Sequence, residues 1–319
     1  MLKRIQKHQV RAGMFIEDLE GEWTENPMSR RRFTISDTAD IEHLKNTCIA
    51  AVIINTAKGL DVDSGVDTLA SRDRTGTTAV SAASDANERR AAVLNVKESV
   101  QALKGFFADA AFSARNIAPV ADQIAETMQK NPLVLLNITR LKSKDETTFV
   151  HSIAVSALMV QLARYVKLDA KMVQLMGMAG LLHDVGKTKI PDDVLNKQGK
   201  LAEEELALIR DHPALGHEIL SRQADMPKIV LDICRHHHER LDGKGYPDGL
   251  PASEISLYVR ICTICDVYDA VTSIRPYKKP WSHMDAVNWM MAQQGAFDRE
   301  LLHEFFSSME TIMETRRRA

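Results

Sequence analysis

A histidine and an aspartate lie side by side at the end of an apolar stretch of this chain. His183 and Asp184 follow residues 172–182, which read MVQLMGMAGLL. An imidazole and a carboxylate are costly to bury without a partner, so the pair favours a metal site. Adjacent positions of a helix diverge by about 100°, which leaves Asp184 free to reach a second ion and to bridge two ions. Lys187 would share the face of His183 if the helix continues that far, and its ammonium would then meet a phosphate oxygen; a lysine near a helix C-terminus is explained equally well by the helix dipole.

Further candidate ligands lie on separate predicted helices. His236, His237 and His238 are consecutive, and a glycine-rich turn at residues 242–247 follows them. Helical bundles build metal centres from the side chains of facing helices, so ligands from several helices fit one centre. A single histidine is more often a packed or surface residue, and the clustering is what favours metal binding. The candidate ligands are His151, His183, Asp184, His212, His237, His238 and Asp266.

The types of these ligands narrow both the metal and the chemistry. Mixed imidazole and carboxylate ligands suit Fe, Mn, Ni or Zn, and the spacing does not choose among them. We expect two divalent ions, and the ligand types leave Fe, Mn, Ni and Zn open. A water that bridges two ions is deprotonated near neutral pH and can be held in line with the phosphorus of a phosphodiester. The pattern therefore indicates a metal-dependent phosphohydrolase in which Asp184 and Lys187 are catalytic, Lys187 by adding a fixed positive charge to the transition state.

Composition excludes several classes of partner. The 319 residues carry a formal net charge of −2, so no overall basic field would attract a nucleic acid polymer or an anionic membrane. The sequence contains no apolar run near the ~20 residues of a membrane-spanning helix, and its start lacks a hydrophobic signal core, so we expect a cytoplasmic protein. The CxxC pair Cys262 and Cys265 lies in an apolar helical run, which favours buried structural thiols over a zinc or redox site.

The chain divides by composition and periodicity. Residues 50–55 are typical of a strand, and Ser36 or Asp37 of a helix start, which indicates a small α/β domain. A stretch rich in Ser, Thr, Asp, Ala and Gly follows and offers little to bury, and beyond it apolar residues recur at helical spacing. We expect a mainly α protein whose parts are a small α/β domain at 1–62, a flexible linker at 63–87, connecting helices at 88–129 and an all-α helical domain at 130–319.

Several motifs in the larger domain resemble the bacterial HD-GYP family. They are Leu182 to Lys187, Ile190-Pro191, His237 to Glu239, Asp242 to Pro247 and Arg275 to Tyr277, and the resemblance covers roughly residues 130 to 310. It implies an all-α HD-superfamily fold and hydrolysis of cyclic di-GMP to the linear dinucleotide pGpG, and in some members to GMP. The N-terminal stretch also resembles the small domain often attached ahead of HD-GYP modules.

The resemblance also implies how the ligands are shared between two ions. One ion would be held by His151, His183, Asp184 and Asp266, and its neighbour by Asp184, His212, His237 and His238. Some members of the family hold a third metal through a glutamate four residues before the first ligand histidine. Here that position is Thr147, and Glu146 would point away on a helix, so we predict a binuclear centre. His236 is expected to be a spectator beside the ligand pair.

Substrate contacts follow from the same resemblance. Those it implies are Lys187, Gly245, Tyr246, Pro247, Arg275 and Lys278. The glycines fit a ligand loop and an ordinary tight turn equally well, because both need positive φ or a close backbone approach.

Other functions stay open at this stage. One is a non-catalytic effector that binds cyclic di-GMP or a signalling protein through the exposed GYP loop, and this function can coexist with turnover. Another is an HD phosphohydrolase for a different nucleotide, against which the 242–247 loop favours cyclic di-GMP. The sequence does not predict the oligomeric state.

Overall fold

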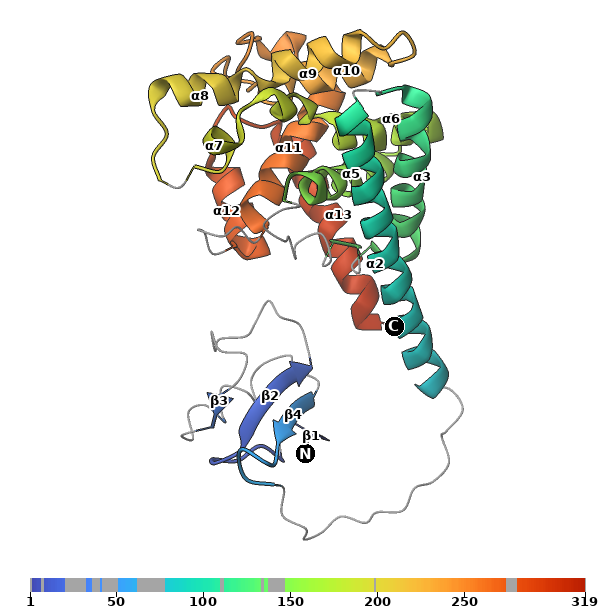
Figure 1. Ribbon diagram of the computed structural model, residues 1–319, viewed down its shortest axis with the longest axis vertical. Helices are drawn as coiled ribbons and strands as arrows, with labels where there is room; N and C mark the ends of the chain where they lie inside the picture. The colour runs from blue at the N-terminus through green and yellow to red at the C-terminus, as the bar shows by residue number, and fades with distance from the viewer. Residues whose placement is uncertain are drawn as a thin grey trace. The chain divides into compact units, whose positions relative to one another are not determined.

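The computed structural model forms two compact units, residues 1–74 and 75–319 (Figure 1). It describes residues 2–6, 9–20, 33–35, 41, 51–61, 78–109, 112–132, 135–136, 147–197, 199–273 and 280–318. The predicted helix start at Ser36 or Asp37 lies outside these residues.

The N-terminal unit contains a four-stranded antiparallel sheet in the order β1-β4-β2-β3. The strands are β1 (Leu2–Ile5), β2 (Phe15–Glu20), β3 (Phe33–Thr34) and β4 (Ala51–Asn55). Strand β4 confirms the strand predicted at residues 50–55. Val52 and Ile54 are fully buried, as expected for alternate residues of a strand with one face on a core. Ile5, Met14 and Ile16 pack into the same core.

The second unit begins with two long helices, α2 (Thr78–Asp109) and α3 (Ala114–Lys130). Helix α2 starts inside the 63–87 segment predicted as a flexible linker, because that part of the sequence is rich in alanine, the strongest helix former, and contains neither Gly nor Pro. The Asn95 side chain joins the two helices by donating to Thr127 Oγ1 at 3.0 Å and accepting from Gln123 at 3.1 Å. The remaining domain boundaries stay a prediction.

The rest of the unit is a helical bundle, which confirms the mainly α prediction. Helix α5 (Thr147–Tyr165) is apolar on nearly every face and lies buried at the centre, as such helices do. Ser156 of α5 donates to the carbonyl of Gly177 in α6 at 2.8 Å and so ties these two helices together. The other elements are α6 (Ala170–Leu182), η3 (Val185–Lys189), α7 (Asp192–Leu195), α8 (Glu203–Arg210), α9 (His212–Ser221), α10 (Lys228–His236), η4 (Ala252–Glu254), α11 (Leu257–Thr272), α12 (His283–Ala292) and α13 (Arg299–Arg318).

Two composition-based predictions bear on the described residues. Cys234, Cys262 and Cys265 are free and buried, and burial raises the pKa of each thiol. The burial of Cys262 and Cys265 agrees with their prediction as buried structural thiols. Cys48 lies outside the described residues. Among the helices that the structure describes, none combines the length and the apolar character needed to cross a membrane. The cytoplasmic location stays a prediction.

Candidate metal centre

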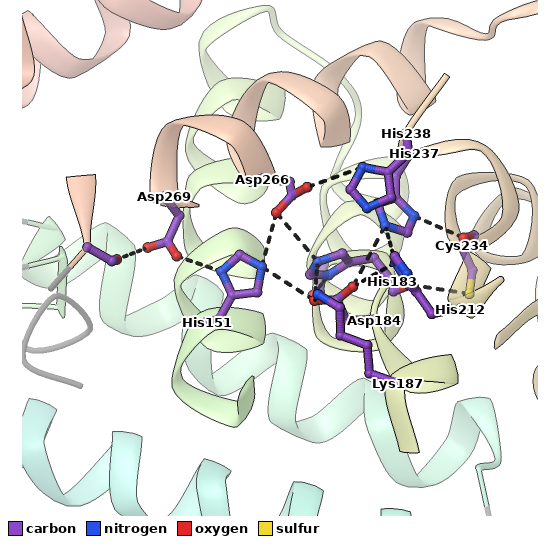
Figure 2. Close-up of polar contacts among 12 residues, drawn as sticks. His151, His183, Asp184, Lys187, His212, Cys234, His237, His238, Asp266 and Asp269 are labelled. Atoms are coloured by element: carbon purple, nitrogen blue, oxygen red, sulfur yellow. Dashed lines mark hydrogen bonds and ion pairs between the residues drawn. The ribbon is translucent and has the colours of Figure 1, made fainter. Parts of the chain in front are cut away.

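The structure brings all seven predicted ligands together inside the bundle (Figure 2). They come from five places in the fold, mostly from helix ends. His151 lies in the second turn of α5, and His183 and Asp184 lie where α6 gives way to η3. The others are His212 at the first position of α9, His237 and His238 at the end of α10, and Asp266 in α11.

Asp184 lies between two groups of ligands and turns a different oxygen to each. Its Oδ2 lies 3.5 Å from His151 Nε2 and 3.3 Å from His183 Nε2. Asp266 completes this first group, with Oδ1 3.0 Å from His151 Nε2. The other oxygen, Asp184 Oδ1, lies 3.1 Å from His212 Nε2 and 3.8 Å from His237 Nε2. This division of the two oxygens is the geometry that a bridging carboxylate requires.

The second group is dominated by imidazoles. The Nε2 atoms of His212 and His237 lie 3.2 Å apart, and the rings of His237 and His238 have centroids 4.1 Å apart. The four residues Asp184, His212, His237 and His238 can each offer a ligand atom within 4.8 Å of the others, as can His151, His183 and Asp266. The two groups match the expected division between two ions.

The residues present fit divalent metal ions. His183 Nε2 and Asp184 Oδ1 are buried and make no hydrogen bond to a described residue, although buried polar atoms normally have partners. Crowded imidazole nitrogens, all directed at shared carboxylates, are a donor set that suits Fe, Mn, Ni or Zn. The side chain of Thr147 and all of Glu146 lie outside the described part of the chain, so the position of a third ion is not tested.

Electrostatics favour the metal-binding protonation states of Asp184, His237 and His238. Burial opposes ionisation of Asp184, but Lys187 and His183 outweigh it and hold the pKa of this carboxyl well below its usual value. Burial and the neighbouring His238 hold the pKa of His237 well below its usual value, and burial lowers the pKa of His238 to about 4. Ionised carboxylates beside neutral imidazoles are the ligand forms that bind a metal. At His151, by contrast, burial is outweighed by the hydrogen bonds to Asp266 and Asp269, which raise the pKa of this imidazole.

Helix α6 does not continue to Lys187. It ends at Leu182, and a 3-10 turn carries the chain through residues 185–189. The turn packs directly on the start of α9, and a side chain at Gly186 would overlap the carbonyl oxygen of His212. Lys187 Nζ consequently lies 2.6 Å from Asp184 Oδ2. The lysine is thus held beside the candidate ligands by its ion pair with Asp184, and not by a shared helical face with His183.

The loop at residues 242–247 folds back over the second group. The ring of Tyr246 stacks on that of His238 with centroids 4.8 Å apart, and the Arg210 guanidinium lies 5.6 Å from the Tyr246 centroid. Gly243 has φ +70°, and a side chain at Gly245 would overlap the backbone of Glu239. Both reasons expected for the glycines are therefore present, one at each position. Pro247 follows a cis peptide bond, whereas Arg275 and Lys278 lie outside the described residues.

Two carboxylates, Glu239 and Asp269, make buried contacts beside the centre that the sequence did not predict, although Glu239 belongs to one of the quoted motifs. Glu239 is buried and accepts hydrogen bonds from the backbone nitrogens of Asp248, Gly249 and Leu250 at 2.7, 3.0 and 3.1 Å. Asp269 accepts a 2.6 Å hydrogen bond from His151 Nδ1. In the sequence, Glu239 stands out only as an acidic residue directly after His237 and His238, and Asp269 only as an acidic residue one helical turn after Asp266. Neither position predicts which groups the carboxylate would contact.

Comparison with known proteins places the chain in a family. The HD domain family matches residues 129–301, which is more than half of the chain. The chain belongs to the HD-domain family. Residues 2–118 match a domain of unknown function (DUF3391), consistent with the resemblance noted for the N-terminal stretch. Together with the motifs at 182–187 and 242–247, these matches identify an HD-GYP protein with an attached N-terminal domain.

Individual relatives agree with this family. A cyclic di-GMP phosphodiesterase of Pseudomonas aeruginosa is 40% identical over 97% of this chain and 77% of its own length. A 3′3′-cGAMP-specific phosphodiesterase of Vibrio cholerae is 35% identical over 54% of this chain and 33% of its own length. Among solved structures, an HDGYP protein of Bdellovibrio bacteriovorus aligns with a TM-score of 0.59 at 17% identity, covering 97% of this chain and all of that one. The last likeness supports the all-α HD fold.

Proposed function

We propose that this protein is a metal-dependent phosphodiesterase that hydrolyses cyclic di-GMP to the linear dinucleotide pGpG, which some members of the family hydrolyse further to GMP. The observation that carries the proposal is the position of Asp184, whose two oxygens face two separate groups of ligands. The name of the Pseudomonas relative, which matches nearly the whole chain, supports the substrate. Lys187 and the loop at 242–247 supply the remaining parts of a phosphodiester site.

The centre would hold two divalent ions, which supply an activated water and draw charge from phosphate oxygens when bound. We propose Fe or Mn, with Ni or Zn as the alternatives. His151, His183, Asp184 and Asp266 would hold one ion, and Asp184, His212, His237 and His238 the other. Lys187 is partly exposed and anchored to Asp184, so its ammonium can contact a nonbridging oxygen where negative charge grows during attack on phosphorus.

The loop and its neighbours would bind the rest of the substrate. The Tyr246 ring is close to the second group and offers an aromatic surface for a guanine base, while Gly245 and Pro247 set the backbone around it. Arg275 and Lys278 would hold the distal phosphate or guanine. The exposed part of the same loop is where we propose that a signalling protein binds.

The direct test is turnover by protein purified without oxygen and supplied in parallel with Fe(II) or Mn(II). Cyclic di-GMP and 3′3′-cGAMP are offered separately, and linear dinucleotide is resolved from mononucleotide. We expect cyclic di-GMP to be the better substrate. A doubly substituted His183→Ala, Asp184→Ala protein should give no product.

Metal analysis separates this function from its non-catalytic alternative. Asp184→Ala should lose both ions, because each group loses the carboxylate that joins it to the other. Two ions retained by this variant would contradict the bridging role. Wild-type protein that binds both ions and cyclic di-GMP but forms no product would instead support a binding or partner-docking effector.

A further inference from the structure

Four histidines of the candidate metal centre differ in the hydrogen-bond partner of Nδ1, the ring nitrogen that faces away from the centre. His183, His212 and His237 each direct Nδ1 at a backbone carbonyl three residues earlier, at 2.8, 2.7 and 2.9 Å respectively. A carbonyl can only accept, so these nitrogens carry the proton and the opposite nitrogen faces the centre. His151 alone among these four directs Nδ1 at a carboxylate, that of Asp269, at 2.6 Å (Figure 2).

Asp269 is itself firmly placed. It lies on α11 three residues after Asp266, so both carboxylates share one face of that helix. The residue is 3% exposed, and its second oxygen accepts a 2.8 Å hydrogen bond from Ser273 Oγ. Carboxylates of one helix thus contact both nitrogens of the His151 imidazole. Asp266 Oδ1 lies 3.0 Å from Nε2, and Asp269 Oδ2 lies 2.6 Å from Nδ1.

We propose that Asp269 is a positioning residue that orients His151 and makes the two metal positions unequal in affinity. The inference rests on the binuclear centre of the proposed function. A carboxylate that accepts Nδ1–H fixes the tautomer, aims the Nε2 lone pair at the ion and makes the imidazole a stronger donor. Loss of such a partner weakens metal binding by about 10- to 100-fold.

The effect falls on one group because, among the residues that the structure describes, no equivalent carboxylate lies behind the histidines of the second group. His212 and His237 donate to neutral carbonyls, and His238 Nδ1 faces Asp266, a ligand, at 3.9 Å. Removing the negative charge of Asp269 therefore lowers the affinity for the ion held by His151, His183 and Asp266. The ion on the side of His212 keeps all of its ligands and all of their supports.

The experiment counts ions and measures both affinities without using turnover. Metal-free protein is titrated with Mn(II), and free Mn(II) is followed by electron paramagnetic resonance for wild type, Asp269→Asn and Asp269→Ala. The matched control is Asp232→Asn, because Asp232 also contacts a histidine, His236 Nδ1 at 2.8 Å, but lies outside both ligand groups. Asn removes the charge at nearly constant shape, and Ala also removes the support for the ring.

We expect wild type to bind two ions, and Asp232→Asn to bind two ions with the wild-type affinities. Asp269→Asn should bind one ion normally and the other about 10- to 100-fold more weakly, and Asp269→Ala should weaken that ion at least as much. Wild-type affinities for both ions in Asp269→Asn, or equal weakening of both ions, would overturn the inference. Wild type that binds fewer than two ions would instead overturn the binuclear centre on which it rests. Because Asn is isosteric with Asp, a folding defect confined to the Ala variant leaves the test intact.

Discussion

His236 and His237 are neighbours at the end of α10, yet they lie in opposite environments. His237 is fully buried among the candidate ligands, where burial and His238 hold its pKa well below the usual value. The His236 side chain is 18% exposed, and its hydrogen bond to Asp232 raises its pKa despite partial burial. Of two identical residues, His236 thus favours the protonated form and His237 the neutral form, because consecutive helical positions point about 100° apart.

His236 belongs to a group of charged residues that we call the outer cluster, which consists of Asp232, Arg235, His236 and Asp248. Arg235 donates to both oxygens of Asp248, at 2.7 and 2.8 Å, and His236 Nε2 lies 3.0 Å from the same carboxylate. Asp248 directly follows the 242–247 loop, so the outer cluster fastens the end of that loop to α10. The inner histidines would bind metal, and the outer cluster would hold the loop in place above them.

The largest effect should separate the two neighbours directly. His237→Gln should lose at least about 100-fold in affinity for one ion and in turnover, since losing a ligand costs more than losing a ligand's support. His236→Gln should keep both ions. Metal content after dialysis and the rate of cyclic di-GMP hydrolysis measure the difference. Equal metal loss in the two variants would end the distinction between inner and outer histidines.

Lys187→Gln tests the cation attached to the inner group. Metal should be retained, because Lys187 is not a ligand, while kcat falls by about 100-fold through loss of a fixed charge at the phosphoryl oxygens. The exposed Lys189 lies in the same turn, and Lys189→Gln is the matched control. Turnover at saturating substrate and metal content decide the outcome. A Lys187→Gln protein with wild-type kcat would remove this residue from the catalytic step.

Glu239→Gln tests the connection between the inner ligands and the loop. One of its oxygens accepts two backbone N–H groups and the other accepts one, so an amide in that place leaves at least one donor without a partner. The free energy of unfolding should fall by about 1–3 kcal/mol and KM should rise more than kcat falls. Urea unfolding and steady-state kinetics measure both, with the exposed Glu254→Gln as the control. Unchanged stability and KM would show that the loop does not depend on Glu239.

The smallest effect concerns pH and the outer cluster. Because the pKa of folded His236 is raised, its contribution to stability is fully present below the unfolded pKa and is lost as pH rises through the folded pKa. Partial exposure limits this contribution to about 1 kcal/mol or less. Wild type should therefore exceed His236→Gln in unfolding free energy at about pH 6, and the gap should shrink by about pH 9. A gap that does not change with pH would show that His236 is not the titrating group.

Sequence and structure contributed different parts of this site. The clustering of the seven candidate ligands could be predicted from residue types and from the motifs that contain them, and the strand at 50–55 from its apolar residues. The sequence could not show whether α6 extends to Lys187. The helix ends earlier because a 3-10 turn forms where Gly186 packs against the backbone of α9. The buried contacts of Glu239 and Asp269 were also out of reach. An acidic residue in a sequence does not reveal whether it faces water or a distant donor.

The sequence by itself determined the mainly α fold through its periodicity, the family through motifs that resemble those of known members, and the order of the candidate ligands through residue type. Only the tertiary structure decided that Asp184 turns one oxygen to each ligand group and that Asp269 supports His151. The latter two residues are 118 positions apart and meet because α5 packs beside α11. The partners of a buried polar group are set by which helices pack together, and that packing involves the whole core.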